Sequence, residues 1–165
     1  MATSTEGGWA STVVVGSITA IAMTAEWLPH QVAGHFAISG LANGFVAREL
    51  YVAVLVGSAL LLPALIAGAL WLAVNHYPDG LNLPNRDYWL APERRAATTA
   101  YLTARAAWLA ALLALLALGL HLLVLRANHL APARLDPASL AALIAAFAAA
   151  LTAWLGDLNR HFERV

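Results

Sequence analysis

The chain has 165 residues, of which 61% are hydrophobic and only 11% are charged, whereas about a quarter of the residues are charged in a soluble domain. This composition indicates a protein that lies in the lipid bilayer. Nine basic and nine acidic residues cancel, so no excess positive charge attracts nucleic acid. The absence of cysteine excludes disulfides, thiolate metal ligands and a cysteine nucleophile.

Four apolar runs are each long enough to cross a bilayer. Crossing a hydrocarbon core of about 30 Å takes about 20 apolar residues in a helix. The runs predict spans at about residues 8–27, 48–76, 101–126 and 137–157. We therefore predict an all-α, polytopic membrane protein with four transmembrane helices, a single domain over residues 1–165. The amino end lacks the pattern of a signal peptide, which predicts that the first run is kept as a helix.

Small residues recur at every fourth position in two of the spans, which predicts close helix packing there. These positions are Thr12, Gly16, Ala20 and Thr24 in the first span, and Ala141, Ala145, Ala149 and Ala153 in the last. Pro63 lies inside the second span, where it removes a backbone donor and predicts a bend. A structural bend is the favoured interpretation, and a functional hinge is the alternative.

The arginines predict the orientation. With four spans, both termini and the central segment face one side. That side holds Arg86, Arg94, Arg95, Arg105, Arg160 and Arg164, and the other side holds Arg48, Arg126 and Arg134. Basic residues favour the cytoplasm. We therefore predict a protein of the bacterial cytoplasmic (inner) membrane with both termini cytoplasmic and the segment between the first two spans outside.

That outer segment carries strong turn signals. Pro29 ends the first helix, and Gly40 and the pair Asn43-Gly44 predict turns. Phe36 and Phe45 bracket this turn. We expect both rings to cover the outer ends of the helices, because each would bury enough surface to be worth about 1.5 to 3 kcal/mol. The loop between the first two helices would then be an ordered lid.

The same segment resembles the uncharacterised domain at the amino end of SdpI-type membrane proteins. The resemblance covers about residues 10–60 and rests on Leu28, Pro29, Val32, His35, Phe36, Gly40, Asn43, Gly44 and Arg48. Asn43 stands where the family commonly has Asp, and Arg48 where it commonly has Lys. The central run Leu-Pro-Asn-Arg-Asp-Tyr-Trp-Leu-Ala-Pro-Glu-Arg-Arg, residues 83–95, is similar to that of short bacterial relatives.

The resemblance implies an integral membrane protein. The named example of the family, a longer chain with more spans, protects its producer against a secreted peptide toxin and signals through a membrane-tethered repressor. A role in immunity or signalling is what this implies by analogy. We take His35, Phe36, Gly40, Asn43 and Arg48 as candidate binding residues of the outer loop.

Four ionisable residues toward the outer side are candidate metal ligands. Glu26, His30, His35 and His121 carry the carboxylate and imidazole groups that zinc and copper accept. The spacing of His30 and His35 fits no standard zinc motif, so histidines that form hydrogen bonds are the favoured interpretation. No cofactor is predicted, and a metal is the less favoured alternative. His121 lies inside a span, where an ionisable residue usually faces the helix bundle.

The polar central segment, residues 82–95, allows two interpretations. Its aromatic residues can lie among the lipid headgroups while its arginines meet phosphates, with the acidic residues paired locally. The alternative is a docking surface for a soluble partner. The residues concerned are Arg86, Asp87, Tyr88, Trp89, Glu93, Arg94 and Arg95.

No catalytic motif is present: there is no phosphate-binding glycine loop, no serine nucleophile elbow and no His-Glu-x-x-His helix. The leading prediction is a small non-enzymatic SdpI-like protein that binds a peptide or another membrane protein at its outer face. The alternative is an accessory subunit of a larger membrane complex. A membrane enzyme or transporter ranks third.

Overall fold

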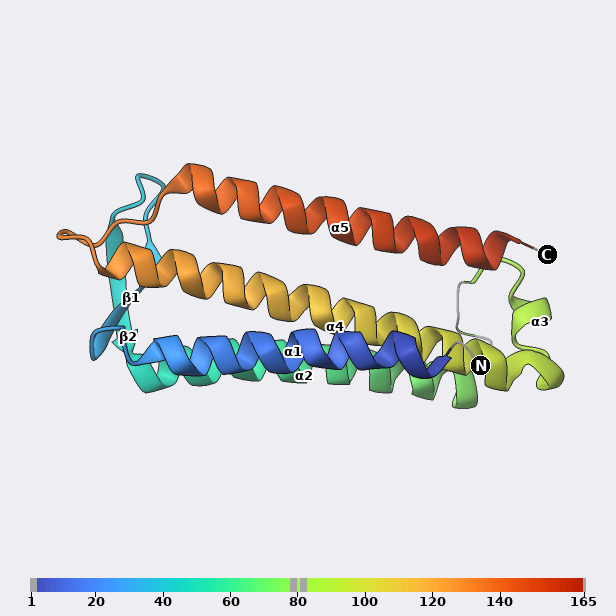
Figure 1. Ribbon diagram of the computed structural model, residues 1–165. Helices are drawn as coiled ribbons and strands as arrows, with labels where there is room; N and C mark the ends of the chain where they lie inside the picture. The colour runs from blue at the N-terminus through green and yellow to red at the C-terminus, as the bar shows by residue number, and fades with distance from the viewer. Residues whose placement is uncertain (1–2, 78–79, 81–82, 165) are drawn as a thin grey trace.

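The computed structural model describes residues 3–77, 80 and 83–164, and in this part of the chain four long helices lie along one another (Figure 1). They are α1 (Thr3–Ala25), α2 (Arg48–His76), α4 (Pro92–Asn128) and α5 (Pro137–Glu163). Short elements join them: strands β1 (Gln31–Phe36) and β2 (Ala42–Ala47), and the one-turn helix α3 (Arg86–Trp89). The chain is mostly helical, as predicted, and the two strands were not predicted.

The four helices match the predicted spans with shifted ends. Helix α2 has the predicted bounds, whereas α1 begins earlier and ends at Ala25. Helix α4 begins at Pro92 instead of residue 101, and α5 continues to Glu163 instead of 157. The hydrophobic pattern missed these extensions because they are polar helical turns. All four helices are long and apolar enough to cross a membrane.

Helix α4 is the centre of the fold. It packs against α1 and α2 on one side and α5 on the other (Figure 1). Small buried residues on α4, Ala106, Ala111, Ala114 and Ala117, allow the neighbouring helices to approach closely. Gly119 fills the same role toward α5, because a Cβ atom there would lie 2.7 Å from Leu143 Cδ1.

Most residues of the predicted small-residue stripes do not form the helix contacts; Thr24, which lies 2.8 Å from His121 of α4, is the exception among the described residues. In α1 the buried positions are Ala10, Ser17, Ile21 and Ala25, whereas Thr12 and Gly16 are exposed. In α5 all four alanines of the stripe are exposed, and Leu143, Phe147, Leu151 and Trp154 are the more buried positions. Large side chains therefore face α4 along most of α5, and Phe162 near its end packs with Val74 of α2 as well.

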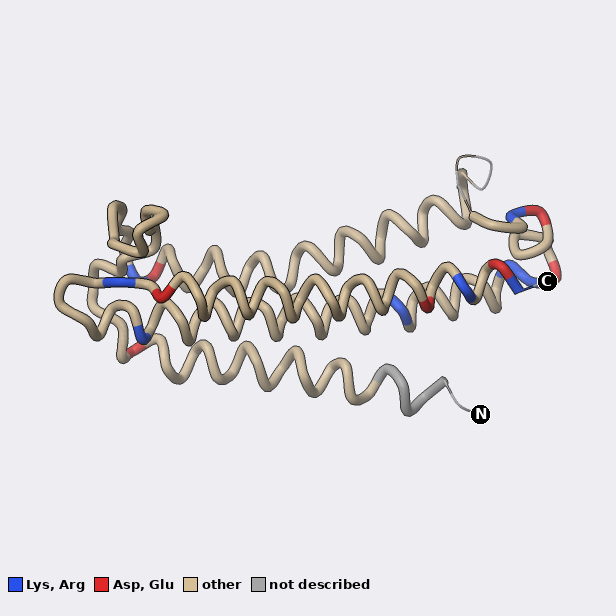
Figure 2. Tube along the Cα trace, turned by 90° about the horizontal axis from the view of Figure 1, so that it is seen from above, with Lys and Arg blue, Asp and Glu red and all other residues tan. Residues whose placement is uncertain are grey.

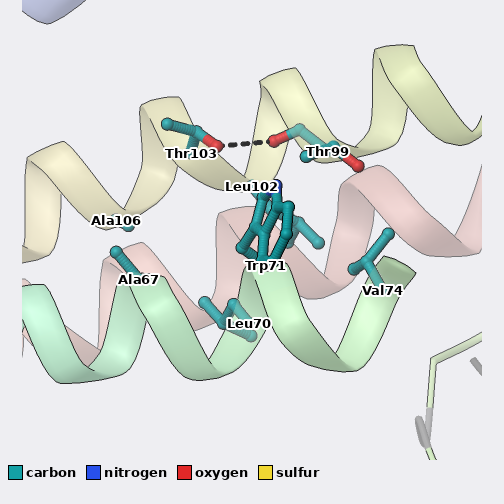
Figure 3. A pocket seen from close by; sticks show the side chains of 8 residues that line it. All are labelled: Ala67, Leu70, Trp71, Val74, Thr99, Leu102, Thr103 and Ala106. Carbon is teal, nitrogen blue, oxygen red and sulfur yellow. Dashed lines mark hydrogen bonds between the residues drawn. The ribbon is translucent and has the colours of Figure 1, made fainter. Parts of the chain in front are cut away.

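Helix α2 continues through Pro63 and bends away from its neighbours toward its carboxyl end (Figure 2). Pro63 is buried, and the loss of its backbone donor accounts for the bend. Beyond the bend, α2 still contacts α4 through the residues of Figure 3, where Trp71 reaches toward Leu102. The gap between them is only about 10 Å³, about the space of one water molecule, so no ligand fits there.

The molecule has two distinct ends. The hairpin of β1 and β2 and the connection between α4 and α5 lie at one end, which we call the hairpin end (Figure 1). Both termini and α3 lie at the other end. The described charged residues gather near the two ends and leave the middle uncharged (Figure 2). The grouping of termini and central segment follows the prediction from four spans.

Candidate binding site beneath the hairpin

The segment predicted as a loop is an antiparallel β-hairpin. Its strands pair from Gln31 with Ala47 to Phe36 with Ala42, with register irregularities around His35. The turn lies at Gly40, whose φ is +83° and whose N–H donates to the Ala37 carbonyl at 2.8 Å. Only glycine adopts this conformation without strain. A Cβ atom there would also collide with the carbonyl oxygen of Leu135.

The pair Asn43-Gly44 does not form the turn, contrary to the sequence prediction. Both residues lie in β2, and Gly44 pairs with His35. A Cβ atom on Gly44 would lie 2.8 Å from His35 Cβ. Gly44 is therefore needed for the close approach of the strands rather than for a turn.

The hairpin is fixed to the helices by Asn128 at the end of α4. Its side-chain oxygen accepts from the Ala33 amide at 2.8 Å, and its amide donates to the Ala33 carbonyl at 3.2 Å. Ala33 is fully buried, so its backbone groups need these partners. The Asn128 side chain thus satisfies the edge of β1 as a third strand would.

Apolar contacts complete this attachment, through residues other than those expected. Val32, with none of its surface exposed, packs with Leu28 and Leu125 over the helix ends. Phe45 is 58% exposed and Phe36 is only half-buried. The expectation that both rings cover the helices was wrong: Val32 and Ala33, early in β1, make the buried contact instead, and Phe36 lies beyond the register irregularities around His35.

Three helices meet at a buried polar cluster below the hairpin. His121 of α4 is fully buried, and its Nε2 lies 2.8 Å from the Thr24 hydroxyl of α1. That hydroxyl is 2.7 Å from the Ala20 carbonyl, so it donates there and accepts from Nε2–H. Nδ1 then accepts from the Tyr51 hydroxyl of α2 at 3.4 Å. A neutral imidazole, with one donor and one acceptor, fits this arrangement.

A cavity of about 590 Å³ opens beneath the hairpin, between β1, β2, α2 and α4. Its wall is mostly apolar and includes Leu50, Val54 and Leu120, with Phe45 and Val46 from β2. Three polar side chains, His35, Tyr51 and Ser58, also line it. An apolar pocket with a few polar groups is the usual form of a ligand site, and this volume suits a lipophilic side chain or a short apolar segment.

The five predicted outer-loop residues all lie at the hairpin end but not in one site. His35 lines the cavity, and Phe36 is the last residue of β1. Gly40 forms the turn, and Asn43 is exposed on β2. Arg48 begins α2 and donates to the carbonyls of Glu26 and Leu28 at 3.4 and 3.3 Å.

The four candidate metal ligands are not brought together. His30 and His35 are exposed, and His121 is buried against Thr24 and Tyr51. Within residues 3–77, 80 and 83–164, no group of three His, Asp or Glu side chains is placed to hold a metal ion. Of these histidines, His121 forms the hydrogen bonds that the favoured interpretation predicted.

The central segment packs onto the end of α5. Asn85, with a left-handed φ of 52°, and Trp89 donate from their side chains to the Phe162 carbonyl at 3.1 and 3.0 Å. These donors satisfy a carbonyl that the end of a helix leaves unpaired. Phe162 is buried with Leu90 and Leu102. The segment is thus a packed cap on α5. Asn82 lies outside the described residues.

The charged residues of this segment differ in their contacts. Arg86 pairs with Asp87 at 3.1 Å, as expected, and Arg94 lies 3.8 Å above the Tyr88 ring. Arg95 donates to the Leu90 carbonyl at 3.3 Å. Glu93 is exposed and has no ion pair among the described residues, so its expected pairing is not found.

The polar residues after residue 156 are helical, and several of them pack against α4. Asp157 pairs with Arg105 at 2.8 Å, and His161 stacks on Tyr101 with ring centroids 3.6 Å apart. The Trp154 indole donates to the Arg105 carbonyl at 3.2 Å. These contacts hold the carboxyl end of α5 against α4.

Sequence reasoning missed Tyr51 and Asn128. A tyrosine near the end of an apolar run is typical of the membrane interface, so Tyr51 gives no signal of a polar contact, and Asn128 lies just after an apolar run. A polar amide just past the end of an apolar helix is the only sequence signal that could have pointed to Asn128. Its partner Ala33 carries no signal at all.

No family model, curated protein or solved structure matches the chain.

Proposed function

We propose that this protein is a small, non-enzymatic SdpI-like protein of the bacterial cytoplasmic membrane, with both termini cytoplasmic and the hairpin outside. In this proposal it acts in immunity or signalling by binding a peptide or membrane protein at the hairpin end. The cavity beneath the hairpin is the observation that carries the proposal.

Exposed apolar surface supports the membrane location. Helix α2 exposes many large side chains along its length, Leu50, Val54, Leu60, Leu61, Leu62, Leu65, Ile66, Trp71 and Leu72. A soluble monomer rarely exposes so large an apolar patch, whereas a bilayer accommodates it. The uncharged middle of the molecule (Figure 2) is consistent with the same location.

The form of the cavity supports a peptide ligand. The cavity lies at the hairpin end, where a ligand from outside would arrive in the proposed orientation. Leu50, Val54 and Leu120 offer an apolar floor, and Tyr51 and Ser58 offer hydroxyls. An apolar side chain with an adjacent peptide group has both kinds of surface. The SdpI-type resemblance points to the same class of ligand.

An immunity assay tests this proposal. We expect a deletion strain to be inhibited by the peptide fraction of its parent's culture medium and rescued by the wild-type gene. Val54→Phe places a ring in the cavity and should abolish the rescue. Ala64→Phe, at an exposed α2 position that lines neither the cavity nor the groove described below, should leave it intact. Rescue by Val54→Phe equal to wild type would refute a role for the cavity.

The exposed surface of α5 supports the alternative, an accessory subunit of a larger membrane complex. Helix α5 packs against α4 (Figure 1), and most of its other residues are exposed. A partner helix could cover that surface. Purification in a mild detergent separates the two candidates, since a stoichiometric membrane subunit would favour the alternative.

A further inference from the structure

A second apolar groove, of about 690 Å³, lies between α1 and α2 at the hairpin end. Its floor is built from small and apolar residues, Ile18, Ala22, Ala25, Val52, Ala53, Val56 and Gly57. The residues of α2 that line it alternate with those that line the hairpin cavity. With 3.6 residues per turn, the groove therefore lies on the opposite face of α2.

Three charged residues form the rim of this groove: Glu26, Arg48 and Glu49. Both carboxylate residues are exposed, and the Arg48 side chain is 26% exposed. Arg48 Nη1 is committed to the carbonyls of Glu26 and Leu28, and Nε lies 3.8 Å from Glu49. Nη2 makes no hydrogen bond among the described residues, so it can donate to an incoming anion.

We propose that this groove binds one phosphatidylethanolamine molecule of the bilayer. An acyl chain lies along the apolar floor, and the phosphate accepts from Arg48 Nη2. The primary ammonium group donates to the carboxylates of Glu26 and Glu49. A cation flanked by two carboxylates complements a headgroup that carries a phosphate beside an ammonium. The inference rests on the proposed membrane location but not on the hairpin cavity.

The charges of the rim predict selectivity among lipids. One arginine and two glutamates give a net negative rim, which disfavours the anionic phosphatidylglycerol. The choline headgroup of phosphatidylcholine keeps both charges but has no N–H to donate. The expected order is therefore phosphatidylethanolamine, then phosphatidylcholine, then phosphatidylglycerol. A groove that merely accepts acyl chains would not distinguish these lipids.

Native mass spectrometry of the detergent-purified protein tests the proposal. The protein is titrated with the three lipids carrying identical acyl chains. We expect half-saturation by phosphatidylethanolamine at about threefold lower concentration than by phosphatidylcholine, an effect of the size of one net hydrogen bond. The double variant Glu26→Gln, Glu49→Gln should remove this difference. Equal binding of all three lipids by the wild type, or an unchanged preference in the double variant, would overturn the proposal.

Further variants test the floor of the groove. Ala53→Phe should weaken binding of all three lipids, and Ala64→Phe on the same helix should not. If Ala53→Phe binds the lipids as tightly as wild type and keeps the same lipid preference, the groove is not the binding site. Extraction of membranes with carbonate at alkaline pH tests the membrane location separately from the lipid site. Release of the protein by carbonate would refute the membrane location itself, whereas a retained protein without lipid selectivity would refute this site alone.

Discussion

Single polar residues decide how the hairpin end is built. Asn128 replaces the missing strand beside Ala33, and His121 joins three helices through Thr24 and Tyr51. In apolar surroundings an unpaired polar group is unfavourable by several kcal/mol. Each of these side chains therefore specifies one arrangement of its neighbours, because any shift would break hydrogen bonds that water does not replace.

Replacement of Asn128 by Ala should loosen the hairpin. The change leaves the buried amide and carbonyl of Ala33 without their partners, at a cost of roughly 1–3 kcal/mol for each group. We expect faster amide hydrogen exchange across residues 31–47 and little change in α4. Asn75→Ala is the matched control, since among the described residues the Asn75 side chain bonds only its own helix, at the Trp71 carbonyl. Equal exchange in both variants would contradict the proposed attachment.

At the scale of elements, the ends of α5 are fixed by different means. At its start, Asp136 accepts from the amides of Ala138 and Ser139 at 3.3 and 3.1 Å, and Pro137 occupies the first turn. At its other end, Asn85 and Trp89 from the central segment supply the donors. The first cap is local in sequence and the second is not, so only the first could be read from sequence.

The start of α5 should be sensitive to acid. Hydrogen bonds from the Ser139 hydroxyl and then from the two amides hold the pKa of Asp136 below its ordinary value. Because folding lowers this pKa, the ionised Asp136 carboxylate stabilises the folded state at any pH above the pKa that the residue has in the unfolded chain. This stabilisation is lost as pH falls through the lower, folded pKa. Exchange of the first α5 amides should rise across this acid range.

The variant Asp136→Asn provides the control for this acid effect. Asparagine keeps a capping oxygen but has no carboxylate to titrate. Its first α5 amides should therefore exchange with no step in the acid range that wild type shows. A step that persists in the variant would assign the titration to another group.

At the scale of the whole molecule, α4 connects all the other helices and the hairpin rests on its end. The charges separate into two groups at the ends (Figure 2). Arg48 begins α2, and Arg126 and Arg134 lie in the last turn of α4 and in its connection to α5, so these three are at the hairpin end. The other six arginines lie toward the opposite end. In a bilayer this asymmetry favours the hairpin end outside.

Labelling of single cysteines tests that orientation. The chain has no native cysteine, so no background must be removed. Ile38 at the hairpin turn is fully exposed, and Glu93 is exposed at the opposite end. An impermeant thiol reagent should label Ile38→Cys in intact cells and should label Glu93→Cys only after lysis. The reverse pattern would place the hairpin, with its cavity and groove, in the cytoplasm.

The sequence by itself determined the four helices and which segments share an end. A long apolar run predicts each helix, and an even number of spans brings both termini to one side, without any knowledge of contacts. The sequence also located the turn at Gly40. It did not determine the strands of the hairpin: Asn43-Gly44 has a turn signal, but Gly44 lies in β2 because only a missing Cβ lets the strands approach at His35.

Only the tertiary structure decided which residues meet. Thr24, Tyr51 and His121 come from three helices, and Asn128 is 95 residues from Ala33 along the chain. Local sequence patterns report periodicity along one helix, whereas these contacts depend on how α4 is rotated and shifted against its neighbours. The same limitation made the alanine stripe of α5 misleading, since a stripe marks a possible contact face, whereas the packing of α5 selected the face with Leu143 and Phe147.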